Sequence, residues 1–431
     1  MNKLNLLLLL MLPLNIQAQT LTCDNKTVEE AFNLAVKTLY KNTCDSLILA
    51  GGTYGGEWVR DVSINSWNAA ALLIPKEAAY SLWSVTTEDR TMIGHQYWDH
   101  IIWALAAYDY YIINNDRQFL RQAYIASKNT MAAREQDAFD SNYGLFTGPS
   151  VFNDGIAGYE EPIYNPQIKD SYVLAHPESK NIMCLSTNCL YFQAYKTLAL
   201  MAKACGDKCS VNGYEHKAKA LKTNIRRNLY DPQANKLYYL IDGHGTLHKY
   251  QEGLGHAFAI LFGVVNKKEA RNLIKKVYIG KYGLPSIYPA FKRFKEHPGR
   301  HNQILWPFVG AFWADACHSV GINEPFLKEL FCQADMAINI NNHCFYEVYN
   351  ENTGKQNGGW QIDHQWESVY DQTWSATGYI RMILQDVLGM RCTLKDITFH
   401  PDKALMKEIG FKSLNGLKFR GKEINIGKSC M

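Results

Sequence analysis

Apolar residues recur along most of the chain with the period of an α-helix rather than the alternation of a strand. Several runs are apolar over more than half of their circumference, which is typical of helices packed on two sides. Those runs are 63–74, 97–113, 187–204, 255–265, 305–320 and 374–388. Amphipathic runs with one charged face, such as 215–230 and 267–278, lie between them. This alternation of about a dozen inner and outer helices predicts an all-α toroid of helical hairpins closed into a ring.

The last part of the chain has a different pattern. From about residue 394, the stretches LKDITFHPDK and LNGLKFRGKEINIGKS alternate in the manner of strands. We therefore predict one helical domain over 19–393 and a short β-rich tail over 394–431.

The first 18 residues have the composition of a secretory signal peptide. They contain one lysine, an apolar run and a small residue, Ala18, at the expected cleavage point. No later stretch reaches about 18 uncharged apolar residues. The sequence predicts an exported protein, periplasmic or extracellular, that has no membrane partner once the signal is removed.

Charge and cysteine content narrow the range of partners. The net charge of +4 comes without basic runs, so nothing indicates a nucleic acid or an anionic membrane. Eleven cysteines, an odd number, leave at least one unpaired within a monomer. Cys205 and Cys209 could form a local disulfide, and the pairs Cys23 with Cys44 and Cys184 with Cys189 stay open. The Cys and His spacings match no metal motif, so we predict neither metal nor cofactor.

The breaks between helices are long and polar, and aromatic residues are abundant. Four loops, 51–61, 145–167, 295–303 and 346–367, carry Gly, Asn, acids and aromatic rings. Loops of this length in a compact helical domain are usually functional. Aromatic residues make up 13 % of the chain, and aromatic faces are common platforms for sugar rings.

The stretch GEWVRDVSIN, 56–65, spans the end of the first loop and the start of the next helical run, and it places Trp58, Arg60 and Asp61 within one turn of chain. A guanidinium fork, a carboxylate and a stacking ring together suit the vicinal hydroxyls of a sugar. The alternative is that Arg60 and Asp61 cap the following helix and interact with its dipole.

The second loop offers a candidate proton donor. Asp154 lies in GPSVFNDGIAGYEEP, where an acid among apolar residues is expected to have a raised pKa. The alternative is an Asx-turn in the Asn-Asp-Gly sequence. Glu160 and Glu161 compete for the same role.

The remaining two loops offer a base and hydroxyl-binding groups. Glu347 lies among aromatic residues in CFYEVYNENTG, as a general base requires, although a buried structural glutamate would look the same. We expect Glu351 to be solvated. The stretch HNQILW suits hydroxyl recognition, although N-capping by Asn302 would explain part of it.

Taken in order, these motifs resemble a known fold family. W-x-R-D, F-N-D-G, H-N-Q-x-x-W-P and Y-E-x-Y-N-x-x-T-G followed by Q-T-W-S-A are similar to the motifs of six-hairpin, (α/α)6-barrel glycosidases. The resemblance covers most of residues 50–390 and is strongest to the amylo-α-1,6-glucosidase (glycogen-debranching) and processing α-glucosidase branch. Segment 97–120 is similar to a Trp-rich helix of those enzymes.

The resemblance implies a role for each matching residue. Asp154 would be the general acid and Glu347 the general base of an inverting hydrolysis. Trp58, Arg60 and Asp61 would bind the non-reducing sugar. The residues that would shape the pocket are Trp98, Asp99, His301, Gln303, Trp306 and Trp374.

The predicted function is therefore hydrolysis of terminal α-linked sugars from an oligosaccharide, in the manner of an α-glucosidase. Another sugar, such as mannose or rhamnose, would fit the same fold, because fold alone does not choose the substrate. Phosphorolysis needs only one catalytic carboxylate, so the candidate base Glu347 favours hydrolysis. A non-catalytic glycan-binding protein is the alternative from another class.

Overall fold

The computed structural model describes residues 19–54 and 58–427. The predicted signal peptide, 1–18, lies outside these residues. Among the helices that are described, none is both long and apolar enough to cross a bilayer.

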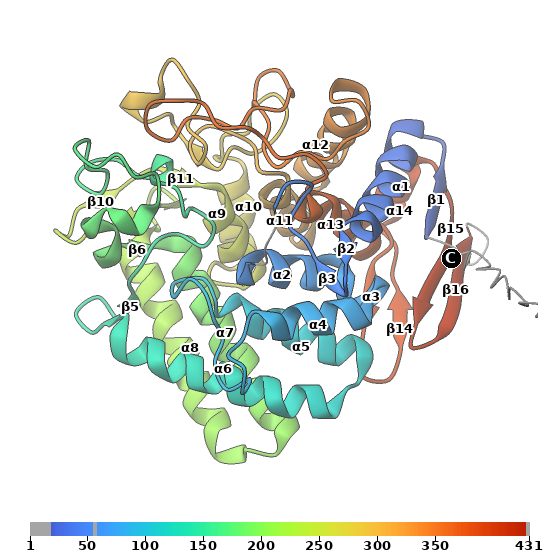
Figure 1. The fold of residues 1–431 in the computed structure, drawn as a ribbon, viewed down its shortest axis with the longest axis horizontal. Coiled ribbons are helices and arrows are strands. Elements are labelled where there is room, and N and C mark those ends of the chain that lie inside the picture. The colour runs from blue at the N-terminus through green and yellow to red at the C-terminus, as the bar shows by residue number, and fades with distance from the viewer. Residues whose placement is uncertain (1–18, 55–57, 428–431) are drawn as a thin grey trace, which may run out of the picture.

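Six helices of the described chain form the inner wall of a ring (Figure 1). Each contacts the next, and the last contacts the first, which closes the ring. In order they are α2 (Val59–Asn65), α5 (Ile102–Asn114), α7 (Leu185–Cys205), α9 (Gly253–Leu261), α11 (Pro307–Ser319) and α13 (Thr373–Arg381). Every residue of α2 is buried, and most of α7 is, because both sides of an inner helix are packed. The predicted all-α toroid is thus confirmed.

The amphipathic helices pack around this ring. In α8 the buried residues Tyr214, Ala218, Leu221, Ile225 and Leu229 form one stripe, and its other faces meet water. The outer helices are α1 (Lys26–Lys41), α4 (Pro75–Ser84), α6 (Arg117–Asp137), α8 (Lys208–Leu229), α10 (Lys267–Ile274) and α12 (Asn323–Asp335). The apolar core lies between the two rings.

Several inner and outer helices continue into short helical segments. Helix α2 runs on through η1 (Ser66–Ala70) and α3 (Ala71–Leu73), α12 through η6 (Met336–Ile340), and α13 through η7 (Met382–Val387). Single 3-10 turns in the loops are η2 (Ile156–Gly158), η3 (Val173–Ala175), η4 (Pro177–Asn181) and η5 (Lys292–Phe294).

Short strand pairs stiffen the connections. They are β2 (Thr43–Cys44) with β3 (Leu47–Ile48), β4 (Phe139–Asp140) with β5 (Leu145–Phe146), β7 (Tyr230–Asp231) with β8 (Lys236–Leu237), and β11 (Gln251–Glu252) with β12 (Ile287–Tyr288). A small sheet has the order β10 (Leu247–His248), β9 (Leu240–Ile241), β6 (Met183–Cys184).

The C-terminal sheet is present, as predicted, but it is built partly from the start of the chain. Strand β15 (Phe411–Phe419) pairs with β16 (Lys422–Gly427) and also with β1 (Thr20–Cys23), both antiparallel. The tail further contains the pair β13 (Met390–Cys392) and β14 (Ile397–Phe399) and a helix, α14 (Lys403–Ile409). This appendage lies at one edge of the ring, beside α1 (Figure 1).

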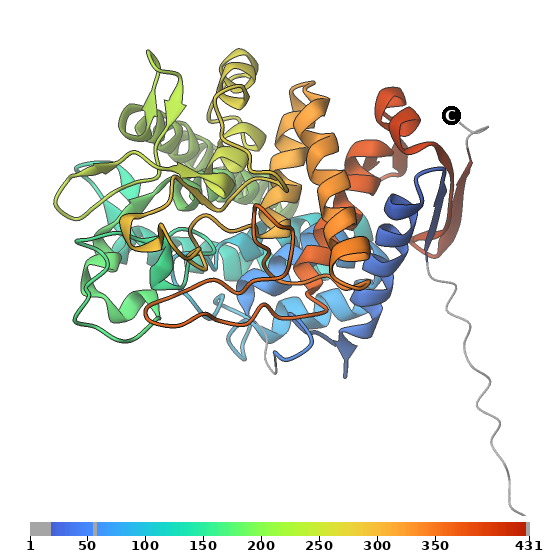
Figure 2. The same cartoon turned by 90° about the horizontal axis from the view of Figure 1, so that it is seen from above.

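The long loops lie side by side and are joined by backbone bridges and side-chain hydrogen bonds. Backbone bridges join Gly299 to Trp360 and Leu305 to Tyr349, so loops from two successive hairpins are tied together. Arg293 donates to the carbonyl of Tyr159 at 2.9 Å, which ties in the 145–182 loop. Figure 2 shows the long orange-to-red connection from α12 to α13 crossing in front of the helices. These loops therefore form one continuous surface above the ring.

The suggested disulfides are not formed. All ten cysteines of the described residues are free thiols, including both members of the pair Cys205 and Cys209. Cys205 ends α7 and Cys209 lies in the first turn of α8, so each belongs to a different helix. The local-bridge interpretation of ACGDKC is therefore wrong.

Candidate active site

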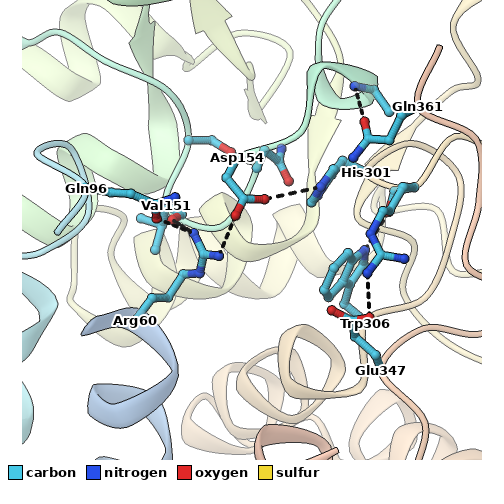
Figure 3. A network of polar contacts seen from close by, with 12 residues as sticks. Arg60, Gln96, Val151, Asp154, His301, Trp306, Glu347 and Gln361 are labelled. Carbon is cyan, nitrogen blue, oxygen red and sulfur yellow. Dashed lines mark hydrogen bonds and ion pairs between the residues drawn. The ribbon is translucent and has the colours of Figure 1, made fainter. Parts of the chain in front are cut away.

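One cavity of about 270 Å³ lies where the loops meet the inner ring. Seven of the residues singled out from the sequence line it: Trp58, Arg60, Asp61, Asp154, Trp306, Glu347 and Trp374. They come from the starts of α2, α11 and α13 and from two loops, so only the folded ring brings them together; Figure 3 shows four of them, Arg60, Asp154, Trp306 and Glu347.

Arg60 connects three segments at one side of the cavity. It lies in the first turn of α2, whose N-cap Trp58 makes no capping hydrogen bond through its side chain. Its guanidinium donates from Nη1 to Asp99 Oδ2 at 3.0 Å and from Nη2 to Asp154 Oδ2 at 3.0 Å (Figure 3 shows the second contact). The charge of Arg60 thus serves the cavity rather than a helix cap.

Asp61 and Asp99 are buried acids with raised pKa values. Burial raises the pKa of Asp61 from 3.8 to about 7, against the opposing charge of Arg60, and the charges of Glu347 and Asp154 add to the rise. Burial also raises the pKa of Asp99 to about 7, although Arg60 opposes it. Asp61 lines the cavity, whereas Asp99 lies behind Arg60 as its buried ion-pair partner.

Asp154 faces the cavity, with 33 % of its side chain exposed. Its Oδ2 accepts from Arg60, and its Oδ1 lies 3.6 Å from His301 Nε2, too far for a hydrogen bond. Burial acts to raise the pKa of Asp154, but the charge and hydrogen bond of Arg60, together with the charge of Arg300, outweigh it and the pKa is lowered. The raised pKa that the sequence predicted for Asp154 is therefore wrong.

The carboxyl group of Asp154 makes no Asx-turn contact with the next residues; it binds Arg60 instead. The competing acids lie elsewhere. Glu160 accepts from the hydroxyl of Tyr250, Glu161 is exposed, and neither lines the cavity. Within the second loop, the acid that reaches the cavity is Asp154.

Glu347 is held on the other side of the cavity. It is 4 % exposed; its Oε1 accepts from the Tyr54 hydroxyl at 2.9 Å and its Oε2 from Arg300 Nη2 at 2.5 Å. Arg300 in turn lies between two indole rings, with 5.4 Å from its guanidinium carbon to the ring centroids of both Trp306 and Trp366. Two donors thus orient the carboxyl group, and it lines the open space, as a general base needs.

Four of the predicted pocket residues do not line the cavity and instead lie behind the residues that do. Trp98 donates its Nε1–H to the carbonyl of Ser150, and the His301 ring stacks on Trp306 at 5.0 Å. Burial lowers the pKa of His301 to about 3, so this imidazole is neutral. The residues of this group that do not line the cavity are Trp98, Asp99, His301 and Gln303.

Two expectations for the third and fourth loops are wrong. Glu351 is not solvated: it is 2 % exposed and accepts from Gln303 Nε2 at 2.8 Å. Asn302 does not cap α11; its Oδ1 accepts from the backbone N–H of Phe291, and Trp306 occupies the N-cap position. Both side chains bind other loop segments.

The cavity also contains residues that sequence reasoning missed. Gln361 binds the second loop through its Oε1, which accepts from the N–H of Ala157 at 2.9 Å. Arg300 directly precedes the recognised HNQ motif, and Tyr54 lies within the first Gly-rich loop, so both had weak signals in the sequence. The missed lining residues with functional side chains are Tyr54, Ser171, Tyr172, Arg300, Gln361 and Trp366. No cluster of His, Cys, Asp and Glu suited to a metal occurs in the part of the chain that is described.

The ring of hairpins and its carboxylate-lined cavity define the class of glycoside hydrolases with an (α/α)6 barrel. The chain belongs to the family of mannosylglycerate hydrolase MGH1-like glycoside hydrolase domains, whose model matches residues 100–375. The expectation of a six-hairpin glycosidase is thereby confirmed, while the glucosidase branch remains a prediction. No curated protein sequence matches the chain.

Solved structures share this fold at low sequence identity. The GH63 mannosylglycerate hydrolase from Thermus thermophilus in complex with glucose is 14 % identical, with a TM-score of 0.65 over 82 % of this chain and 99 % of its own. A GH78 family rhamnosidase of Bacillus sp. GL1 is 14 % identical, with a TM-score of 0.63 over 95 % of this chain and 40 % of its own. A rhamnosidase from Klebsiella oxytoca with rhamnose bound is 12 % identical, with a TM-score of 0.58 over 84 % and 65 %.

Proposed function

We propose that the protein is an exo-acting, inverting glycosidase that removes one terminal α-linked hexose from an oligosaccharide. The observation that supports this most is the presence of two carboxylates, Asp154 and Glu347, in one small cavity, each with its own arginine. A cavity of about 270 Å³ lined by several aromatic rings suits a single sugar ring better than a long chain.

Asp154 would be the general acid. Its Oδ1 accepts no hydrogen bond from the described residues and is therefore free to carry the proton that passes to the departing glycosidic oxygen. Because Arg60 lowers the pKa of Asp154, the proton must be gained as the substrate displaces water from the cavity and the carboxylate loses solvation.

Glu347 would be the general base. Tyr54 and Arg300 hold both of its oxygens, so the carboxylate is fixed while it takes a proton from an attacking water. Inversion requires the two carboxyl groups to stand roughly 6.5–9.5 Å apart, with room for that water between base and sugar. Asp154 and Glu347 make no contact with each other and bind different arginines, which is consistent with such a gap.

Glucose is our first candidate for the terminal sugar, because the sequence motifs resemble those of α-glucosidases. Mannose is the second candidate, because the family and a similar solved structure carry the name mannosylglycerate hydrolase. Hydrolysis of 4-nitrophenyl α-D-glucoside and α-D-mannoside, compared at equal concentration, separates the two.

The stereochemical course tests the mechanism. Proton NMR of the first product formed from an α-glycoside should show the β-anomer, before mutarotation mixes the two. Release of the α-anomer would refute the inverting mechanism. A requirement for inorganic phosphate would show a phosphorylase instead, and sugar binding without turnover would show a glycan-binding protein.

We also place this activity outside the cytoplasm, because residues 1–18 have the composition of a signal peptide. N-terminal sequencing of the protein recovered from its native compartment should begin at Gln19. An intact Met1 on the mature protein would contradict export by this route.

A further inference from the structure

The cationic side chains that line the cavity already form ion pairs and hydrogen bonds with other protein groups. Two lining residues are cationic, Arg60 and Arg300, and both are almost fully buried. Arg300 donates to the carboxylate of Glu347 and to the carbonyls of Gly358 and Glu367 at 2.9 and 3.0 Å. Its faces are covered by the indoles of Trp306 and Trp366, so it has little left to offer a ligand.

Both terminal nitrogens of the Arg60 guanidinium also donate to protein groups. Its Nη1 donates to Asp99 and to Gln96 Oε1 at 3.1 Å, and its Nη2 donates to Asp154. His301, the nearest imidazole, is buried with a pKa lowered to about 3 and carries no charge at neutral pH. A ligand carboxylate would therefore find no free cation among the described lining residues.

Carboxyl groups surround these two cations. Asp61, Asp154 and Glu347 all line the space, and Asp99 adds a fourth carboxyl group directly behind Arg60. An anionic ligand would therefore find both cations already paired with carboxyl groups, and burial of an unpaired charge is costly. A neutral sugar meets no such penalty, because its hydroxyls can donate to the carboxylates.

The leaving-group side of the cavity offers an aromatic face instead. The leaving group departs on the side of the general acid, and the backbone of Tyr172 forms a bridge with Gly155, next to Asp154. The N–H of Val173 also donates to the carbonyl of Asp154 at 2.8 Å. Tyr172 lines the cavity and is 41 % exposed. An exposed ring at this position is suited to stack on a sugar ring.

We propose that the leaving-group side binds an uncharged sugar on the ring of Tyr172 and discriminates against carboxylate-bearing groups such as glycerate. The proposal rests on the proposed hydrolytic function and makes it more specific. It distinguishes this chain from what the name mannosylglycerate hydrolase says of the similar solved structure.

A matched pair of substrates tests the charge argument. The compounds 2-O-α-glucosylglycerol and 2-O-α-glucosylglycerate differ by a hydroxymethyl group in place of the carboxylate; the mannosyl pair is used if mannose is the preferred sugar. We expect kcat/KM for the glycerol compound to be higher by about tenfold or more, given the cost of burying a carboxylate that has no cationic partner. Equal or better turnover of the glycerate compound would overturn the proposal.

The α-glycosyl fluoride of the same sugar serves as a control substrate. It separates failure of the proposed leaving-group specificity from failure of the proposed hydrolytic function. Its leaving group is too small to need the Tyr172 side and needs little help from a general acid, so its hydrolysis reports binding of the sugar and attack by the water that the base activates. If no fluoride is hydrolysed, the proposed function fails. Calorimetric binding of the glycerol and glycerate compounds to Glu347→Gln still decides the charge argument in that case, and tighter binding of the glycerate compound would overturn it.

Variants of Tyr172 test the stacking. Tyr172→Ala should lower the ratio of kcat/KM for a neutral α-linked disaccharide to that for the glycosyl fluoride by about tenfold. Tyr172→Phe keeps the ring and should keep that ratio. A ratio unchanged in Tyr172→Ala, with circular dichroism showing a folded protein, would refute the role of Tyr172.

Discussion

Arg60 Nη2 donates to Asp154 Oδ2 at 3.0 Å, across 94 residues of sequence. The contact leaves Oδ1 as the oxygen free to exchange a proton with a substrate. The same contact lowers the pKa of Asp154, so Arg60 both orients the proposed acid and opposes its protonation. Catalysis by Asp154 therefore depends on how strongly Arg60 acts.

Removal of the Arg60 charge should shift the pH profile. In Arg60→Gln the pKa of Asp154 rises, because burial is then no longer opposed by the charge and hydrogen bond of Arg60. The alkaline limb of kcat/KM, which follows loss of the proton from the free acid, should move to higher pH, even though the maximum falls. Arg60→Lys keeps the charge and should shift the limb less. An alkaline limb unmoved in Arg60→Gln would argue against Asp154 as the acid.

Glu347→Gln should strongly lower turnover while preserving binding. The amide cannot take a proton from water, so kcat is expected to fall by about 10²–10⁴-fold, the usual contribution of a positioned general base. Calorimetry with the unreacted substrate should still show binding. Glu367→Gln is the matched control, because the Glu367 side chain is exposed and lies in the same loop. Comparable loss of activity in Glu367→Gln would point to loop damage rather than loss of a base.

Asp61→Asn should stabilise the protein above neutral pH. The pKa of Asp61 is raised from 3.8 to about 7, so the folded state holds a proton over that range that the unfolded chain releases. Wild-type stability therefore falls as pH rises from about 4 to 7, and the asparagine removes this loss. We expect Tm of Asp61→Asn to exceed that of wild type by about 2 °C or more at pH 8 and to match it near pH 4.

Scanning calorimetry at the two pH values measures this difference. Asp45→Asn changes an exposed aspartate in the same way and should leave Tm equal to wild type at both. A lower Tm of Asp61→Asn at pH 8 would mean that the carboxylate makes favourable contacts in the folded state.

The helical ring could be predicted because its signal is local. The run 187–204 coincides with α7, Leu185–Cys205, within two residues, since a helix packed on two sides must be apolar on most of its face. Strand β1 had no such signal: its partner, β15, begins nearly 390 residues later. Four residues that pair at long range cannot be distinguished from a loop in the sequence alone.

The candidate site shows the same contrast between features with a local sequence signal and features that depend on long-range contacts. Glu347 could be found because aromatic residues flank it in sequence, whereas Arg300 and Tyr54 reach it from 47 and 293 residues away. The direction of the pKa shift at Asp154 was mispredicted for this reason: local sequence shows the apolar neighbours, and the deciding charge comes from Arg60. Electrostatics depends on tertiary contacts that no single motif contains.

Tyr54 should act through Glu347. Its hydroxyl donates to Glu347 Oε1 at 2.9 Å, so Tyr54→Phe frees one oxygen of the proposed base and lets the carboxylate turn. We expect kcat to fall by about tenfold, the usual effect of a hydrogen bond to a charged group, while KM for an aryl glycoside changes little. Tyr370→Phe removes a hydroxyl from an exposed tyrosine that does not line the cavity and should leave both constants as in wild type. A rise in KM with kcat unchanged would show that Tyr54 binds the sugar and does not position the base.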